Sequence, residues 1–259
     1  MDTEPAAVVA LLEELVADIR AGLGDDLVAI YVFGSYVAGD FEPGVSDLDL
    51  VAVSTRQLHE PELMTLDRMH MSFAGRHPEW SDRIEVVYIG VDALRSFRTS
   101  RGRLAVISPD EPFHLRDERP AEWIQNWFLV RETGVALFGP VATSLIPAIA
   151  WPEFVSAIRR YAREVAARSL DDVSPGQLAY NVLTICRALR AVETDTLSSK
   201  REAAAWVQEW DPDRAWLIGA ALRCRLSGGT IGFNDPDSRS EAVAFIRQVA
   251  DRISRPIPG

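Results

Sequence analysis

The hydrophobic pattern of this chain of 259 residues changes from short strand-like runs to helical periodicity part-way along its length. Apolar residues at helical spacing predict one helix from Pro5 to about Gly22 and another over residues 58–74. Short apolar runs that are rich in β-forming residues predict strands at 27–33, 47–53 and 84–89. The first half is therefore expected to form a small α/β domain around a sheet.

Helical periodicity dominates the second half and is expected to continue from Ala121 onwards. A domain boundary is expected near residue 150, where three prolines punctuate the change: Pro140, Pro147 and Pro152. We therefore expect an α/β domain over residues 1–150 and an all-α helical domain over residues 151–259. The candidate helices of the second domain are 151–170, 177–192, 201–210, 214–226 and 240–253.

Composition narrows the function classes before any motif is considered. Hydrophobic residues make up 47% and charged residues 25%, as in an ordinary soluble globular protein. No apolar run has the length of a membrane span, and the acidic start lacks the basic and apolar segments of a signal peptide. The chain has only two cysteines, so nothing indicates an oxidising compartment. We expect a cytoplasmic monomer without a membrane partner.

The formal net charge of −11 bears on the kind of partner. So acidic a surface repels phosphate backbones, which disfavours a nucleic-acid partner. It suits a small cationic substrate better, although the same charge can serve only to keep the protein soluble.

Polar residues gather where the first predicted strand ends and the second begins. Gly34 ends the first strand and lets backbone amides approach a phosphate, while Ser35 adds a hydroxyl donor. A connection of eleven residues ends at Ser46, and Asp47 and Asp49 then share one face of an extended strand, roughly 6.5–7 Å apart. Two such carboxylates suit Mg²⁺, which keeps several waters and bridges to substrate phosphates. Taken alone, the two aspartates are compatible with a solvent-facing strand and the Gly-Ser pair with an ordinary turn. Their succession along the chain, a strand that ends in Gly-Ser followed by a strand that opens with Asp-x-Asp, favours metal-dependent phosphoryl-type transfer.

A third carboxylate, Glu85, lies on the third predicted strand. Alternation places it on the same face as Arg83 and Val87. If this strand neighbours the strand of Asp47 and Asp49, Glu85 lies beside the proposed metal pair, where it can ligate metal or deprotonate a hydroxyl. The alternative is a glutamate that is paired with Arg83 on an exposed face.

On these residues the chain resembles the nucleotidyltransferases of the polymerase-β superfamily, whose signature is Gly-Ser followed by Asp-x-Asp or Asp-x-Glu. More narrowly, it resembles the aminoglycoside adenylyltransferases that modify streptomycin and spectinomycin. The narrower resemblance rests on two further stretches. One is 133–140, and the other runs from 181–187 through 199–200 to 203–206.

The resemblance implies a polymerase-β-like domain followed by a helical domain, with the active site in the cleft between them. It also implies transfer of AMP from ATP to a substrate hydroxyl with Mg²⁺ as cofactor, and Glu85 as the general base. The residues that would bind the ATP phosphates and the metal are Gly34, Ser35, Ser46, Asp47, Asp49, Arg187 and Lys200.

Lys200 is the only lysine among 27 basic residues, the others being arginines. An ammonium group on a flexible side chain suits binding to a phosphate that shifts during reaction, and such a role would explain why a lysine is present at this position. The alternative is a surface lysine without a function.

The acceptor is where the chain departs from the resemblance. In that family, acidic residues just before the 181–187 stretch bind the cationic drug, but here the matching positions are Gln177 and Leu178, beside Tyr180. Asp171 and Asp172 lie several residues earlier. The family also has an aromatic residue near the nucleotide, and the matching position in this chain lies close to Arg225. We expect an aminoglycoside or aminocyclitol antibiotic as substrate.

Two alternatives remain open from the sequence. One is a nucleotidyltransferase that acts on another small hydroxyl compound or on a protein. The other is a catalytically silent nucleotide-binding homologue, which the presence of Asp47, Asp49 and Glu85 disfavours.

Overall fold

A computed structural model describes residues 3–109, 111–116, 118–170 and 172–255, and the chain divides into two compact units. The first unit is Met1–Ala148 and the second is Ile149–Gly259. No helix in the described part of the chain is both long enough and apolar enough to cross a bilayer.

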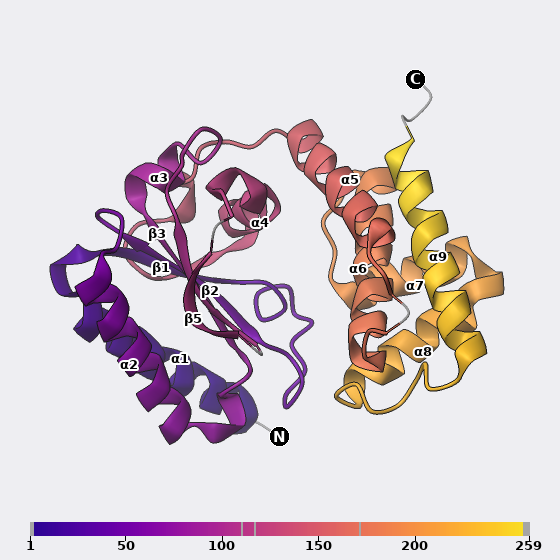
Figure 1. Cartoon of the computed structure of the whole chain (residues 1–259), viewed down its shortest axis with the longest axis horizontal. Helices are drawn as coiled ribbons and strands as arrows, with labels where there is room; N and C mark the ends of the chain where they lie inside the picture. Colours follow the sequence, from indigo (N-terminus) through magenta and orange to yellow (C-terminus); the bar gives the residue numbers. More distant parts are fainter. Residues whose placement is uncertain (1–2, 110, 117, 171, 256–259) are drawn as a thin grey trace. The chain divides into compact units, whose positions relative to one another are not determined.

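The described strands of the first unit form one mixed sheet of six strands, in the order β5-β4-β3-β2-β1-β6 (Figure 1). β2 and β3 pair in parallel, while the other neighbouring strands pair antiparallel. The parallel pair requires a crossover, and helix α2 provides it. The strands are β1 (Leu27–Phe33), β2 (Leu48–Ser54), β3 (Ile84–Gly90), β4 (Leu104–Ser108), β5 (Glu111–Arg116) and β6 (Val135–Phe138).

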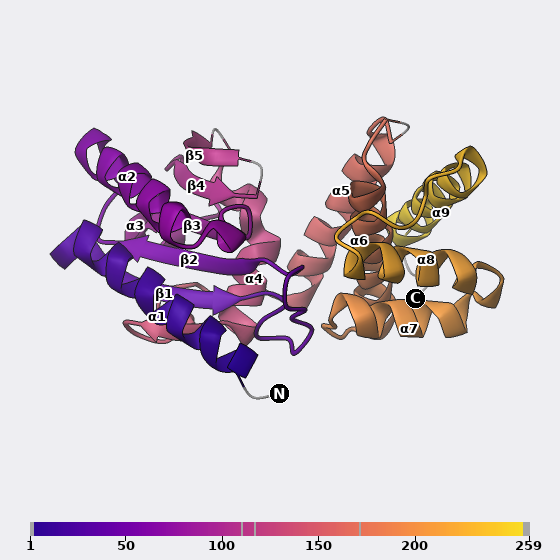
Figure 2. The same cartoon turned by 90° about the horizontal axis from the view of Figure 1, so that it is seen from below.

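Helices cover both faces of this sheet. The α-helices of the unit are α1 (Thr3–Leu23), α2 (Glu60–Arg76), α3 (Val91–Arg95) and α4 (Ile124–Thr133). α1 and α2 cover one face and α4 lies against the other, and a view from below places α1 and α2 in front of the strands (Figure 2). Leu48 and Leu50 of β2 belong to the core under α1 and α2. The intervening Asp49 therefore faces the opposite side of the sheet.

The second unit is helical, and α6 lies at its centre. α6 packs against α5, α7, α8 and α9, the other four long helices of the unit. Buried residues accordingly occur on most sides of it, among them Val182, Leu183 and Ala188. Both cysteines are buried free thiols, and burial raises their pKa values. The helices are α5 (Trp151–Ala167), α6 (Pro175–Thr194), α7 (Lys200–Trp210), α8 (Ala215–Leu226) and α9 (Pro236–Ser254).

The α/β and helical composition of the two halves is as the sequence predicts, with one correction. Helical structure does not continue without interruption from Ala121, because strand β6 follows α4 and pairs with β1 at the edge of the sheet. Because β6 has only four residues, its local sequence carries little strand signal, and its conformation depends on the pairing with β1.

Candidate active site

Asp49 and Glu85 lie directly opposite each other on the parallel strands β2 and β3. On its other side, Asp49 is the register partner of Phe33, the last residue of β1. Side chains that are paired in register share one face of a sheet, so the two carboxylates lie together on the face away from α1 and α2. The strand of Glu85 is thus a neighbour of the strand of Asp49, which is the condition for placing Glu85 beside the aspartates. Asp47 directly precedes β2, two residues before Asp49, and is half-buried.

Gly34 makes room for the Asp49 carboxylate. A Cβ atom built on Gly34 would lie 2.0 Å from Asp49 Oδ2 and 2.9 Å from Asp49 Cγ. Gly34 also has a φ of +73°, a backbone conformation that costs other residues energy. The glycine at the end of β1 is therefore required both for the turn and for the position of a candidate metal ligand. The sequence indicates only its value for phosphate approach.

The chain after Gly34 forms a compact turn that begins with Ser35. The backbone N–H of Ala38 donates to the carbonyl of Gly34 at 3.0 Å, and that of Asp40 donates to the carbonyl of Ser35 at 3.1 Å. Gly39 closes the turn with a φ of +70°. The Ser35 hydroxyl is half-buried and makes no hydrogen bond within the described part of the chain. It is thus available to a ligand at the end of β1.

Ser46 has a structural role at the start of β2. It is 4% exposed, and its hydroxyl accepts a hydrogen bond from the backbone N–H of Glu42 at 2.9 Å. Its carbonyl accepts two hydrogen bonds from the Arg83 guanidinium, at 3.1 and 2.7 Å, and that guanidinium also lies 4.1 Å above the Trp80 ring. These contacts fix the backbone that leads into Asp47.

The contacts of Arg83 also decide between the two interpretations of Glu85. No ion pair joins Glu85 to Arg83, and no described residue donates a hydrogen bond to the Glu85 carboxylate. Burial raises the pKa of Glu85; the nearby Arg116 opposes this shift, and the charges of Asp47 and Glu111 add to it. A half-buried carboxylate with a raised pKa and without a hydrogen-bond donor takes up a proton readily. The pairing with Arg83 on an exposed face is therefore wrong.

Arg116 and Glu111 are neighbours of the site that the sequence does not indicate. Both lie on β5, and the Arg116 guanidinium donates to Glu111 Oε2 at 2.8 Å. It also lies 3.6 Å from a carboxylate oxygen of Glu118. The segment 111–116 is polar and has no apolar run, so only its pairing with β4 marks it as a strand.

The donor set of the site fits a magnesium ion better than a transition metal. Within the described residues, no group of three or more His, Cys, Asp or Glu side chains could hold a metal. Mg²⁺ is commonly bound through one or two carboxylates, with waters and substrate phosphates as its other ligands. Asp47 and Asp49 match that pattern.

Two protein-family models match separate parts of this sequence. A nucleotidyltransferase domain matches residues 13–94, and the C-terminal domain of aminoglycoside adenylyltransferases matches residues 144–252. The chain belongs to the aminoglycoside adenylyltransferases of the nucleotidyltransferase superfamily. The family resemblance read from the sequence and the prediction of an adenylyltransferase enzyme are both confirmed.

The fold of this adenylyltransferase also matches a solved structure. It is similar to spectinomycin adenyltransferase AAD(9) from Enterococcus faecialis, which was crystallised with ATP and spectinomycin. The TM-score is 0.75 at 18% sequence identity, and the match covers 95% of this chain and 99% of the other. A search of curated proteins found no match.

In the helical unit of the adenylyltransferase, the structure places Lys200 beside Tyr180. Lys200 begins α7, and its Nζ lies 4.1 Å from the centre of the Tyr180 ring on α6. Arg187 is half-buried on α6, two turns after Tyr180 and thus on the same side of that helix. Arg225 lies in the last turn of a different helix, α8.

Gln177 and Leu178, at the positions where the family resemblance implies acidic residues, differ in their exposure to solvent. Leu178 is fully buried in the helical core, so it lines no drug site. Gln177 is exposed, and its side-chain amide donates to Asn181 Oδ1 at 3.3 Å. Asp172 is exposed in the segment before α6, while Asp171 lies outside the described residues.

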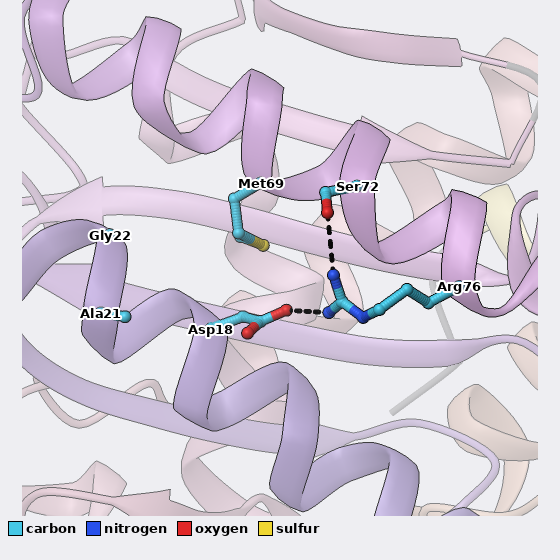
Figure 3. Close-up of a pocket in the computed structure, with 6 residues that line it drawn as sticks. All are labelled: Asp18, Ala21, Gly22, Met69, Ser72 and Arg76. Atoms are coloured by element: carbon cyan, nitrogen blue, oxygen red, sulfur yellow. Dashed lines mark hydrogen bonds and ion pairs between the residues drawn. The ribbon is translucent and has the colours of Figure 1, made fainter.

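A hollow between α1 and α2 is separate from the candidate active site (Figure 3). It has a volume of about 290 Å³, and Arg76 bridges it by contacting Asp18 and Ser72. Figure 3 shows these side chains turned toward one another. Because α1 and α2 cover the face of the sheet that Asp49 does not share, this hollow cannot bring a ligand to the carboxylates.

Proposed function

We propose that this protein transfers AMP from ATP to a hydroxyl group of an aminoglycoside or aminocyclitol antibiotic such as streptomycin or spectinomycin. The observation that carries the proposal is the pairing of Asp49 with Glu85 beside Gly34, in a chain with both adenylyltransferase domains. This arrangement provides two carboxylates for a metal, one for a proton, and a glycine turn for phosphates.

Asp47 and Asp49 would hold Mg²⁺. When bound, the ion neutralises negative charge that develops on the phosphates during transfer. The contacts of Ser46 with Arg83 and Glu42 fix the start of β2, so both aspartates keep their positions before ATP arrives. Such fixed ligands require little reorganisation during the reaction.

Glu85 would act as the general base. The substrate hydroxyl oxygen attacks the α-phosphorus of ATP, its proton passes to the Glu85 carboxylate, and the bond to the β-phosphate oxygen breaks with release of pyrophosphate. The raised pKa of Glu85 makes its carboxylate a stronger base than an exposed glutamate.

Five residues would bind the phosphates of ATP. In the first unit, the backbone at Gly34 and the hydroxyl of Ser35 are at the end of β1, and Ser46 precedes the aspartates. In the helical unit, Arg187 and Lys200 are the cations that we assign to the same phosphates. A guanidinium provides paired donors to phosphate oxygens, whereas an ammonium provides a mobile point charge.

The assignment of the acceptor rests on similarity and on charge. The similar AAD(9) structure contains spectinomycin, and the present chain has a net charge of −11, which suits a cationic ligand. Against strong binding stands uncharged Gln177, because each missing charge-assisted hydrogen bond costs roughly 1.5–3 kcal/mol. We therefore expect weak but measurable adenylylation of at least one of the two drugs.

Mass spectrometry of drug incubated with the protein, ATP and magnesium tests the acceptor. The expected result is a product heavier than streptomycin or spectinomycin by one AMP unit, with an equal amount of pyrophosphate. Pyrophosphate release on another acceptor, without a mass shift on either drug at high protein concentration, would reject the antibiotic as substrate.

Replacing Glu85 with glutamine should lower turnover about 10²- to 10⁴-fold, the usual contribution of a general base. ATP binding should remain, because the phosphates are held by other residues. The rate of pyrophosphate release and the dissociation constant for ATP are measured on the same preparation.

Glu60→Gln is the matched control, since this exposed residue begins α2, which covers the face of the sheet that Glu85 does not share. An equal loss of ATP affinity and turnover in Glu85→Gln would instead identify Glu85 as a metal ligand. Unchanged turnover would exclude both roles.

A further inference from the structure

The position of Lys200 is unfavourable for a lysine on local grounds. It is the first residue of α7, where the N-terminal end of the helix dipole is positive. A cation in the first turn is repelled by that partial charge, yet the chain places its only lysine there. The contact of its ammonium with a ring on α6 offsets part of this local cost.

The backbone at Lys200 is firmly held by a capping box. The Ser199 hydroxyl accepts a hydrogen bond from the backbone N–H of Glu202 at 3.1 Å, and the Glu202 carboxylate accepts one from the backbone N–H of Ser199 at 2.9 Å. Ser199 itself is buried. The Cα of Lys200 thus has a fixed position, and movement of the residue is confined to its side chain.

The ring of Tyr180 contacts the charged end of that side chain. α6 and α7 pack against each other, and the Lys200 ammonium lies 4.1 Å from the centre of the ring, within the range of a cation–π interaction. Tyr180 is 47% exposed, so its ring does not serve mainly to fill the core. The exposed ring therefore offers one of its faces to a cation.

Tyr180 also lies on the same side of α6 as Arg187. Burial raises the pKa of Tyr161 on α5 to about 12, and nearby Tyr180 and Arg187 act on it in opposite directions. Arg187 follows Tyr180 by two turns of α6, so both lie on the side of that helix where the Lys200 ammonium contacts the Tyr180 ring.

We propose that Tyr180 is a positioning residue that holds the Lys200 ammonium ready for the phosphates of ATP. This inference rests on the proposed function, because it assumes that Lys200 binds ATP. A lysine side chain loses much rotamer freedom when it binds a ligand, and a ring that already restricts it lowers that loss. A cation–π contact occupies one side of the ammonium, so its N–H groups on the other side can donate to a phosphate while the contact with the ring is kept.

The single lysine permits a direct test in the protein without ATP. Protein labelled with carbon-13 lysine gives one set of lysine side-chain NMR signals, and a ring current from Tyr180 shifts the protons next to Nζ upfield. We expect this shift in the wild type and in Tyr180→Phe, its loss in Tyr180→Leu, and its retention when ATP is added to the wild type. The same chemical shift in wild type and Tyr180→Leu would overturn the proposal.

Steady-state kinetics test the consequence for ATP. Tyr180→Leu should raise the KM for ATP about two- to fivefold with little change in kcat, the size expected when one lysine side chain loses more of its rotamer freedom on binding. Tyr180→Phe should match the wild type, because the ring face and not the hydroxyl makes the contact. In a Lys200→Met background, Tyr180→Leu should have no further effect on KM.

Two kinetic outcomes would contradict the role of Tyr180. One is an equal effect of Tyr180→Leu with and without the lysine, and the other is an equal effect of the Phe and Leu variants. If the wild type transfers no AMP, the proposed function fails, but the NMR comparison still decides whether the ring holds the lysine and whether the contact remains when ATP is added.

Discussion

Replacing Asp47 or Asp49 with asparagine should abolish AMP transfer, with turnover falling roughly 10³-fold or more. Each change keeps the shape of the side chain but removes a charge that Mg²⁺ requires, and metal stabilisation of the transferred phosphoryl group is worth several kcal/mol. Pyrophosphate release at saturating magnesium measures the loss. Circular dichroism should show unchanged secondary structure, because both residues are only half-buried and the buried apolar residues of β2 are unchanged.

Asp25→Asn is the control for these variants. Asp25 is exposed just before β1, at the end of the strand opposite Gly34, so its replacement should leave turnover unchanged. Near wild-type turnover in either the Asp47 or the Asp49 variant would show that the metal is not held there.

Gly34→Ala should reduce turnover at least about 100-fold, because it displaces the Asp49 carboxylate. The new Cβ would lie 2.0 Å from Asp49 Oδ2, so the carboxylate must move by about 1 Å or more, a displacement that costs a catalytic site on that order. The left-handed backbone adds a loss of stability of roughly 1–2 kcal/mol. Turnover and the midpoint of denaturant unfolding measure the two effects separately.

Gly44→Ala separates backbone strain from the clash with Asp49. Gly44 has a φ of +75°, close to that of Gly34, but beyond its chain neighbours no atom lies within 4 Å of the position that a Cβ would take. We expect a similar loss of stability with turnover near that of the wild type. Equal turnover in the two alanine variants would mean that strain, and not the position of the carboxylate, explains the effect at Gly34.

Most of the first unit could be predicted because its central strands are apolar and end at clear signals. β1 ends at Phe33, where Gly34 follows, and β2 and β3 are runs that a sheet buried on both faces requires. β5 could not be predicted because Glu111–Arg116 is a polar edge strand. It is a strand because it pairs with β4 and because its alternate residues Phe113 and Leu115 pack against the core.

The candidate site could be predicted in part for the same reason. The alternation of Asp47, Asp49 and Glu85 follows from strand periodicity, whereas the nearby Arg116 depends on the unpredicted β5. The burial of Leu178 follows from the helices that surround α6, which no local pattern reveals. The clash that reserves position 34 for glycine needs atomic coordinates, since Asp49 is distant from it along the chain.

The parallel pairing of β2 and β3 has a consequence for how such an enzyme tolerates evolutionary change. Asp49 and Glu85 are separated by one inter-strand spacing, about 4.8 Å, which backbone hydrogen bonds set in any sheet. Surrounding side chains can therefore diverge widely without altering the separation of the two backbone positions. The 18% identity between this chain and a protein with a closely similar fold illustrates such divergence. The spacing is inherited with the topology, so selection on the neighbouring residues is free to act on stability and on the choice of acceptor.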